Sequence, residues 1–207
     1  MEILGIDLAG SEKRKTGICL MDEELKANCL ILFKDKEILE FIDKEKPKLI
    51  AIDAPLSLPL GRKNLRRSKI HFRKCDKELF SLGIKFFPIT LEPMRSLTKR
   101  GMKLRKILKK RGFEVIEVYP GASQDLLSIP RKGKGIEKLL SGLKKLGVRG
   151  LKKNLTGDEL DAITCCYTGL MYLKKNYITI GNKKEGQIIL PNKVCYNYKK
   201  GRKKTNK

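Results

Sequence analysis

The chain has 207 residues, a length that suits one sizeable α/β domain with its own hydrophobic core. Lysine and arginine number 47 against 23 aspartate and glutamate residues, so the formal net charge is +24, which is too large for an ordinary solvated surface and predicts a polyanionic partner such as nucleic acid. No apolar run is long enough to cross a membrane, and the six cysteines contain no C-x-x-C pair, so we expect no membrane partner and a reducing, cytoplasmic setting.

The first part of the chain predicts three strands, a helix and a fourth strand. Residues 2–8, 16–22 and 25–32 read as strands that can form an antiparallel meander. Residues 35–45 have apolar positions at helical spacing and predict a short amphipathic helix. The continuous apolar run at 48–53 is typical of a central parallel strand.

The segment from about 54 to 112 predicts a basic helical insertion in the domain. It opens with a basic stretch at 62–74, continues with a short helix near 75–82, and ends with a basic amphipathic helix at 93–111. Gly112 follows that helix, in the position where helices commonly stop. The insertion therefore places much positive charge between the fourth strand and the next one.

The second half predicts one more strand, several helices and a terminal hairpin. The strand is expected at 113–118, and the remaining elements are short helices near 121–128 and 135–146, a long helix to about 174, and a hairpin formed by 178–180 and 187–190. Thr156 and Glu159 have the spacing of a capping box that starts the long helix. We expect one domain over 1–192, followed by a basic flexible tail at 193–207.

Acidic residues stand at the ends of predicted strands and on one helix. Asp7 ends the first strand and Asp53 ends the fourth, while Asp158 and Asp161, three residues apart, share one face of the long helix. Carboxylates held together repel one another unless a cation lies between them. These four aspartates therefore predict a site for Mg²⁺ or Mn²⁺, with Asp7 between two ions, Asp53 on one, and the helical pair on the other.

Other interpretations of these acids stay open. Asp7 and Asp53 could be polar strand ends that cap neighbouring loops, and Asp158 lies in the first turn of a helix, where the helix dipole favours an acid in any case. Glu117, in the strand expected beside Asp53, is a candidate fifth catalytic carboxylate, either as a ligand or to orient water. Asp76 is interpreted as a helix-start acid paired with a nearby arginine.

Basic residues of the insertion are candidates for contacts with nucleic acid. Phosphate contacts need arginine and lysine but carry no sequence information. The candidates in the first basic stretch are Arg62, Arg66, Arg67, Arg73 and Lys74. The alternative is a solvated face, since lysine-rich and glutamine-poor sequences are typical of proteins from hot environments.

Several motifs together resemble a known family. The sequence is similar over residues 1 to about 191 to a predicted-nuclease family of the ribonuclease H-like superfamily, domain-of-unknown-function family four-twenty-nine, and more distantly resembles Holliday-junction resolvases. The matching segments are Gly-Ile-Asp-Leu-Ala-Gly at 5–10, Ala-Ile-Asp-Ala-Pro-Leu-Ser-Leu-Pro at 51–59, Arg-Lys-Cys-Asp at 73–76, Glu-Val-Tyr-Pro-Gly-Ala at 117–122 and Gly-Asp-Glu-Leu-Asp-Ala at 157–162. The resemblance implies a ribonuclease H-like mixed sheet, an antiparallel three-strand meander plus parallel strands, flanked by helices.

The function expected from these observations is metal-dependent hydrolysis of phosphodiester bonds in DNA or RNA. The resemblance implies nuclease activity only as the usual chemistry of the superfamily. A non-catalytic nucleic-acid-binding protein is the first alternative. A nucleotide-dependent phosphotransferase is the second, because the loop from Asp7 to Gly17 could cradle a phosphate. Action on a symmetric junction would call for a two-fold homodimer.

Overall fold

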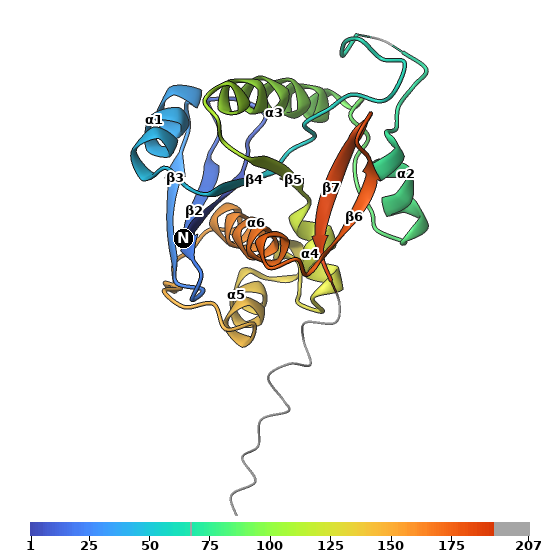
Figure 1. The fold of residues 1–207 in the computed structure, drawn as a ribbon. Helices are drawn as coiled ribbons and strands as arrows, with labels where there is room; N and C mark the ends of the chain where they lie inside the picture. Colours follow the sequence, from blue (N-terminus) through green and yellow to red (C-terminus); the bar gives the residue numbers. More distant parts are fainter. Residues whose placement is uncertain (67, 193–207) are drawn as a thin grey trace, which may run out of the picture.

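Seven strands form one mixed sheet in the computed structural model, which describes residues 1–66 and 68–192 (Figure 1). The strand order is β3-β2-β1-β4-β5-β7-β6. The strands are β1 Glu2–Asp7, β2 Thr16–Asp22, β3 Ala27–Leu32, β4 Leu49–Asp53, β5 Val115–Val118, β6 Tyr177–Asn182 and β7 Gly186–Pro191. The expected basic tail at 193–207, and Arg67, lie outside the described residues.

The centre of the sheet is parallel and its two edges are antiparallel. β1, β2 and β3 form the meander predicted from the sequence, and β4 pairs in parallel with β1, with Asp7 opposite Asp53. β5 continues the parallel part beside β4, as predicted. The terminal hairpin adds a feature that the sequence did not indicate, because β7 joins the sheet in parallel with β5 and makes β6 an edge strand.

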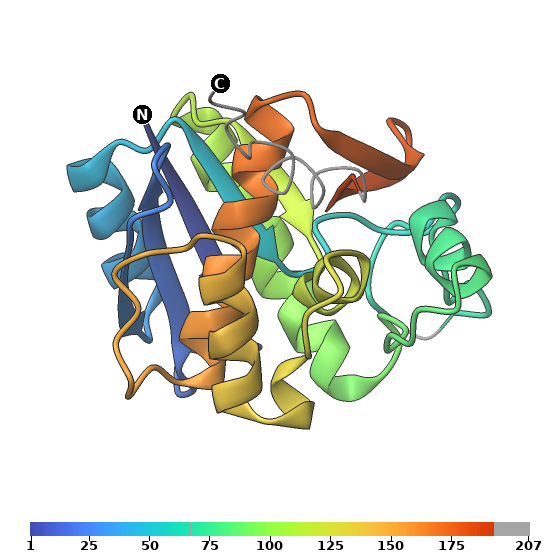
Figure 2. The same cartoon turned by 90° about the horizontal axis from the view of Figure 1, so that it is seen from below.

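Helices cover both faces of this sheet. The helices are α1 Asp35–Glu45, α2 Lys74–Ser81, α3 Glu92–Lys110, α4 Pro120–Leu126, α5 Ile136–Lys145 and α6 Gly157–Leu173, with a 3₁₀ turn, η1, at Lys132–Lys134. α1 and α3 enclose one apolar core with residues such as Ile38, Ile52 and Leu104, and α6 lies across the opposite face, with α5 beside it (Figures 1 and 2). Each large aliphatic side chain buried in these cores contributes about 1.5–3 kcal/mol relative to its exposed form.

Helix α6 lies very close to the sheet because glycines face it. A Cβ on Gly5 of β1 would come 2.0 Å from the carbonyl oxygen of Ala162, and a Cβ on Gly17 of β2 would come 2.1 Å from that of Asp158. No L-residue with a side chain could stand at either position without moving the helix. The two glycines thus bring the first turns of α6 down onto the sheet beside the end of β1.

The start of α6 is fixed by the capping box expected from the sequence. The Thr156 hydroxyl accepts a hydrogen bond from the Glu159 backbone N–H at 3.3 Å, and the Glu159 carboxylate accepts one from the Thr156 N–H at 2.8 Å. Such a cap stabilises a helix by about 0.5–2 kcal/mol. It also determines which residue begins the helix, and so which face carries Asp158 and Asp161.

A buried arginine is one of the links between the insertion and the sheet. Arg73, at the start of α2, has a side chain that is 2% exposed and pairs with both Asp76 and Glu117. The predicted helices of the insertion are confirmed as α2 and α3, each displaced by one residue at its ends. Among the described residues, no helix is both long enough and apolar enough to cross a membrane.

Candidate functional site

Asp7 and Asp53 lie side by side at one end of the sheet. They are the last residues of β1 and β4 and are opposite each other in the parallel register. The carboxyl ends of parallel strands are where open α/β sheets gather their ligands. The sequence placed both residues at strand ends, and the structure makes these ends neighbours.

Asp158 and Asp161 reach the same place from α6, and a lysine lies among the acids. The Lys132 ammonium nitrogen is 3.2 Å from Asp7 Oδ2, 3.3 Å from Asp158 Oδ1 and 2.8 Å from Asp161 Oδ2. One cation therefore contacts three of the predicted ligands. Lys132 belongs to the turn η1, and its side chain is 43% exposed.

The charged groups of this cluster shift one another's pKa values. Burial raises the pKa of Asp7 to about 7, with Asp161 and Asp158 adding to the rise and Lys132 opposing it. Burial, followed by the charges of Asp7 and Asp161, raises the pKa of Asp53 well above its usual value. Burial alone would lower the pKa of Lys132, but the neighbouring carboxylates outweigh burial and raise it. Asp7 and Asp53 therefore resist ionisation here, while the Lys132 ammonium is stabilised.

Asp161 is oriented by a residue that the sequence did not single out. Gln124, buried in α4, donates from Nε2 to Asp161 Oδ1 at 2.7 Å and to the Thr164 hydroxyl at 3.2 Å. The other carboxylate oxygen of Asp161 is the one that faces Lys132. Gln124 thus fixes the direction in which Asp161 presents its charge. Nothing in the local sequence around 124 indicated this role.

The four aspartates have the donor chemistry of a Mg²⁺ or Mn²⁺ site, although Lys132 is paired with three of them. All four donors are carboxylate oxygens, the ligand type that these hard cations prefer. Asp53 accepts no hydrogen bond from any residue that the structure describes, so its oxygens remain available. In the described part of the chain, no three acidic, histidine or cysteine side chains are already arranged to hold an ion. A divalent cation bound by Asp7, Asp158 and Asp161 would have to displace the Lys132 ammonium, which pairs with all three.

Known proteins resemble the chain in structure rather than in sequence. No family model matches it, and no curated protein matches it in sequence. A structure of Thermus thermophilus RuvC in complex with a Holliday junction substrate superposes with a TM-score of 0.52 at 13% identity, covering 84% of this chain and 96% of that one. The fold is ribonuclease H-like. Another structure of Thermus thermophilus RuvC has a TM-score of 0.49 at 14% identity, covering 84% of this chain and 97% of that one.

Glu117 occupies a different environment from the four clustered aspartates. Its carboxylate accepts hydrogen bonds from the Arg73 guanidinium at 2.7 and 2.8 Å and from the Leu56 backbone N–H at 2.8 Å. Both oxygens are engaged and the residue is buried, so it has a structural partner where the sequence suggested a ligand or a water-orienting base. The interpretation of Asp76 as a helix-start acid paired with an arginine is confirmed, with Arg73 as that arginine.

The prediction that Arg73 contacts nucleic acid is wrong. The sequence placed it in a basic groove for nucleic acid, but its guanidinium is enclosed by Asp76, Glu117 and the Ser57 hydroxyl and has no exposed surface to offer a phosphate. Burial of the whole side chain was invisible in the sequence because Arg73 belongs to a segment rich in exposed basic residues, such as Arg66 and Lys74. The motif containing Arg73 therefore marks a connection in the core, not a surface contact.

The other basic residues predicted to contact nucleic acid differ in how far their side chains are already engaged within the protein. Arg62 donates to the carbonyl oxygens of Asn64, Arg66 and Ile70, so it shapes its own loop. Arg66 and Lys74 are exposed, and Lys74 is 3.8 Å from Glu78. Arg67 lies outside the described residues.

A groove of about 860 Å³ opens directly beside the carboxylates of the ribonuclease H-like domain. Asp7, Asp158 and Lys132 form part of its wall, and the loop after β1 contributes three consecutive basic residues, Lys13, Arg14 and Lys15. All three are exposed, and none is paired with an acid among the described residues. The sequence indicated that this loop could cradle a phosphate, and the structure places its cations next to the acidic cluster.

Proposed function

We propose that the protein is a Mg²⁺- or Mn²⁺-dependent nuclease that hydrolyses phosphodiester bonds in nucleic acid. The observation that carries this proposal is the convergence of Asp7, Asp158 and Asp161 on one ammonium group, with Asp53 beside them, at the ligand-binding end of the sheet. A cluster of this charge needs a cation, and its donor set suits a hard divalent one.

The four aspartates would hold the metal, and Gln124 would keep Asp161 directed toward it. When bound, the divalent cation would activate water and polarise the phosphoryl oxygen. Lys132 must then leave the carboxylates. Since it lines both the acidic cluster and the adjoining groove, the released ammonium can pair with a substrate phosphate.

The proposed substrate is a nucleic acid whose backbone follows the basic groove. Lys13, Arg14 and Lys15 would contact phosphates next to the carboxylates, and Arg66 and Lys74 would extend the contacts along the insertion. Affinity should then fall steeply as salt rises. A four-way DNA junction is the first substrate to test, because the RuvC structure similar in fold is bound to a Holliday junction. A symmetric junction would engage two copies of the chain.

We also propose that the chain is related to domain-of-unknown-function family four-twenty-nine. The segments that resemble this family contain the residues of the acidic cluster and of the buried arginine connection, namely Asp7, Asp53, Arg73, Glu117, Asp158 and Asp161. Those segments lie at the acidic cluster and at the buried arginine connection, which supports grouping them as one functional and structural unit.

A second candidate function is non-catalytic binding of nucleic acid. One observation favours it: Lys132 already neutralises three of the carboxylates, so the fold does not depend on metal to hold them together. In that case the basic groove would bind phosphates, and the acids would serve to position Lys132.

Cleavage assays with purified protein separate the two candidates. Four-way junctions, duplexes, single strands, RNA and RNA–DNA hybrids should be incubated with Mg²⁺, Mn²⁺ or Ca²⁺. The nuclease proposal expects cleavage with the first two metals but not with Ca²⁺, whose looser coordination does not fix an attacking water. Asp7→Asn should abolish cleavage and leave binding equal or tighter, because it removes a negative charge near the phosphates.

Glu159→Gln is the matched control for the carboxylate substitution. Glu159 lies on the same helix but caps Thr156, and glutamine also serves in a capping box, so this variant should remain active. If every substrate is bound and none is cut with either metal, the nuclease proposal is abandoned in favour of the binding protein.

A further inference from the structure

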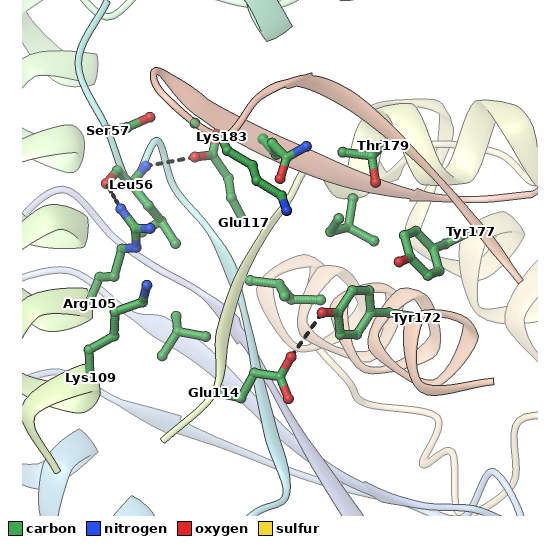
Figure 3. Close-up of a pocket in the computed structure, with 15 residues that line it drawn as sticks. Leu56, Ser57, Arg105, Lys109, Glu114, Glu117, Tyr172, Tyr177, Thr179 and Lys183 are labelled. Atoms are coloured by element: carbon green, nitrogen blue, oxygen red, sulfur yellow. Dashed lines mark hydrogen bonds between the residues drawn. The ribbon is translucent and has the colours of Figure 1, made fainter. Parts of the chain in front are cut away.

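A large cavity lies away from the aspartate cluster, between α3, β5 and the β6–β7 hairpin (Figure 3). Its volume is about 800 Å³, and none of the four clustered aspartates lines it. Cavities of roughly 300–1,000 Å³ are the usual size of small-molecule sites. The cavity is therefore large enough for a ligand of its own.

The cavity exists because β5 and β7 are joined over a short length. They pair at Glu117 with Ile188 and at Val118 with Ile189, while the earlier residues of both strands line the cavity. α3 covers β5 on one side and the hairpin rises on the other. The strand pairing of the sheet therefore determines the cavity, and its walls come from elements that are far apart in sequence.

One part of the cavity is rich in positive charge that nothing in the described structure neutralises. Lys109 from α3 and Lys183 from the hairpin both line it, and neither ammonium group forms a hydrogen bond or an ion pair with any residue the structure describes. Arg105 extends from α3 beside them and donates one N–H to the Leu56 carbonyl at 3.1 Å, which leaves other donors free. Three cations from two walls suit an anion with several oxygens.

The two acids of the cavity do not cancel these cations. Glu117 is already paired with Arg73 behind the wall, at 2.7 Å. Glu114 accepts a hydrogen bond from the Tyr172 hydroxyl at 2.9 Å, on the side of the cavity where the tyrosines lie (Figure 3). The charge of Lys109 and Lys183 therefore remains available to a ligand.

The opposite part of the cavity offers aromatic surface. Tyr172 and Tyr177 lie with ring centroids 4.8 Å apart at an angle of 49°, and both line the cavity. The Tyr177 hydroxyl makes no hydrogen bond to another described residue. Ile116 and Ile189 add apolar lining to the cavity. A planar ring could stack there while its charged group reaches the lysines.

We propose that this cavity is a second ligand site that binds a free nucleotide, with its phosphates on Lys109, Lys183 and Arg105 and its base on Tyr172 and Tyr177. The site is independent of the proposed nuclease centre, because it needs neither metal nor the aspartates. The Arg73–Glu117 pair forms part of the boundary between this cavity and a smaller one of about 170 Å³ beside Asp53.

Isothermal titration calorimetry on the full chain, in EDTA, tests the proposal with AMP, ATP and inorganic pyrophosphate as probes. ATP should bind more tightly than AMP because it brings more negative charge to the lysines. Lys109→Ala combined with Lys183→Ala should weaken ATP binding by at least about tenfold. Tyr177→Ala should weaken AMP and ATP binding but leave pyrophosphate binding unchanged, because only the nucleotides carry a base to stack.

The matched control removes the same charge from adjacent positions outside the cavity. Lys110→Ala combined with Lys184→Ala changes α3 and the hairpin turn equally, yet neither lysine lines the cavity. The affinity of this control variant for ATP should stay within about twofold of the wild-type value. Equal losses in both double variants, or absence of nucleotide binding by the folded wild type, would overturn the proposal.

A ten-nucleotide single strand provides the last arm of the test. Loss of its binding in the Lys109 and Lys183 variant, with no binding of free nucleotides to the wild type, would show that the cavity is part of a polymer's path. That result also overturns the free-nucleotide proposal. Asp7→Asn should bind ATP as the wild type does, so failure of the nuclease proposal leaves this one standing.

Discussion

Gly17 of β2 lies directly beneath the backbone of Asp158, so close that a Cβ at position 17 would come 2.1 Å from the Asp158 carbonyl oxygen. This contact, together with that of Gly5 against Ala162, places the acidic turn of α6 beside Asp7. The position of two candidate ligands thus depends on the lack of a side chain on a neighbouring strand.

We therefore expect Gly17→Ala to disturb the site without changing any acid. The added methyl group should lower the free energy of unfolding by about 1–3 kcal/mol, as overpacking does. It should also reduce the rise in melting temperature produced by Mn²⁺, because Asp158 and Asp161 move away from Asp7. Gly133→Ala, which has open space around its Cβ, is the control and should change stability by less than about 0.5 kcal/mol. An equal response of both variants would contradict this account.

Lys132→Ala should have opposite effects on the metal-free and metal-bound protein. Removing the ammonium leaves the carboxylates of Asp7, Asp158 and Asp161 without their shared cation, so the metal-free protein should lose about 1–3 kcal/mol. Mn²⁺ no longer has to displace a lysine, so the metal-induced rise in melting temperature should exceed that of the wild type. Calorimetric melting with and without Mn²⁺ measures both effects. Lys134→Ala, in the same turn, should leave both unchanged.

The raised pKa of Asp7 predicts how stability depends on pH. Its carboxyl has a pKa of about 7 in the folded protein, because of burial and then of Asp161 and Asp158. The unfolded chain releases that proton near pH 4. Between these values the folded state holds a proton that the unfolded state has lost, so stability from this group is greatest at low pH and falls as pH rises toward 7.

Asp7→Asn removes that dependence, since asparagine does not ionise. Relative to the wild type, the variant should gain stability as pH rises from 4 to 8, by up to about 4 kcal/mol for a shift of roughly three units. Urea unfolding of the metal-free proteins at several pH values measures the difference. Parallel stability curves would show that Asp7 is not the buried acid inferred from the structure.

The buried pair of Arg73 and Glu117 should behave as a structural connection. Glu117→Gln leaves the Arg73 charge with one acidic partner, Asp76, and should cost about 3–5 kcal/mol. The Mn²⁺-induced shift in melting temperature should stay close to that of the wild type, because Glu117 does not belong to the aspartate cluster. If Glu117→Gln instead abolished that shift, Glu117 would be restored as a metal ligand.

The elements of the fold were predictable where the sequence has a local period or a cap. The alternating and continuous apolar runs located the strands of the meander and β4, and the Thr156–Glu159 spacing located the start of α6. The placement of Asp7 and Asp53 at strand ends was also predictable, because the apolar run of each strand stops at its aspartate. These signals lie within a few neighbouring residues.

The features that the sequence did not predict depend on contacts between residues that are distant in the chain. Lys132 contacts Asp7 across 125 positions, and Arg73 contacts Glu117 across 44, so no local pattern distinguishes them from the many other basic residues. Gln124 likewise meets Asp161 only when α4 packs beside α6. The pairing of β7 with β5 is a further long-range event, and it creates the cavity assigned to a nucleotide.

Under the proposed function, the ammonium that the chain supplies to its own acidic cluster separates folding of the domain from its loading with metal. The newly made domain can fold in a medium poor in divalent ions, and the later arrival of an ion becomes an exchange of one cation for another. A polyanion in the groove would favour that exchange by giving the departing lysine a new partner. On this scheme metal and polymer load cooperatively, and a protein without its polymer would remain in a resting state.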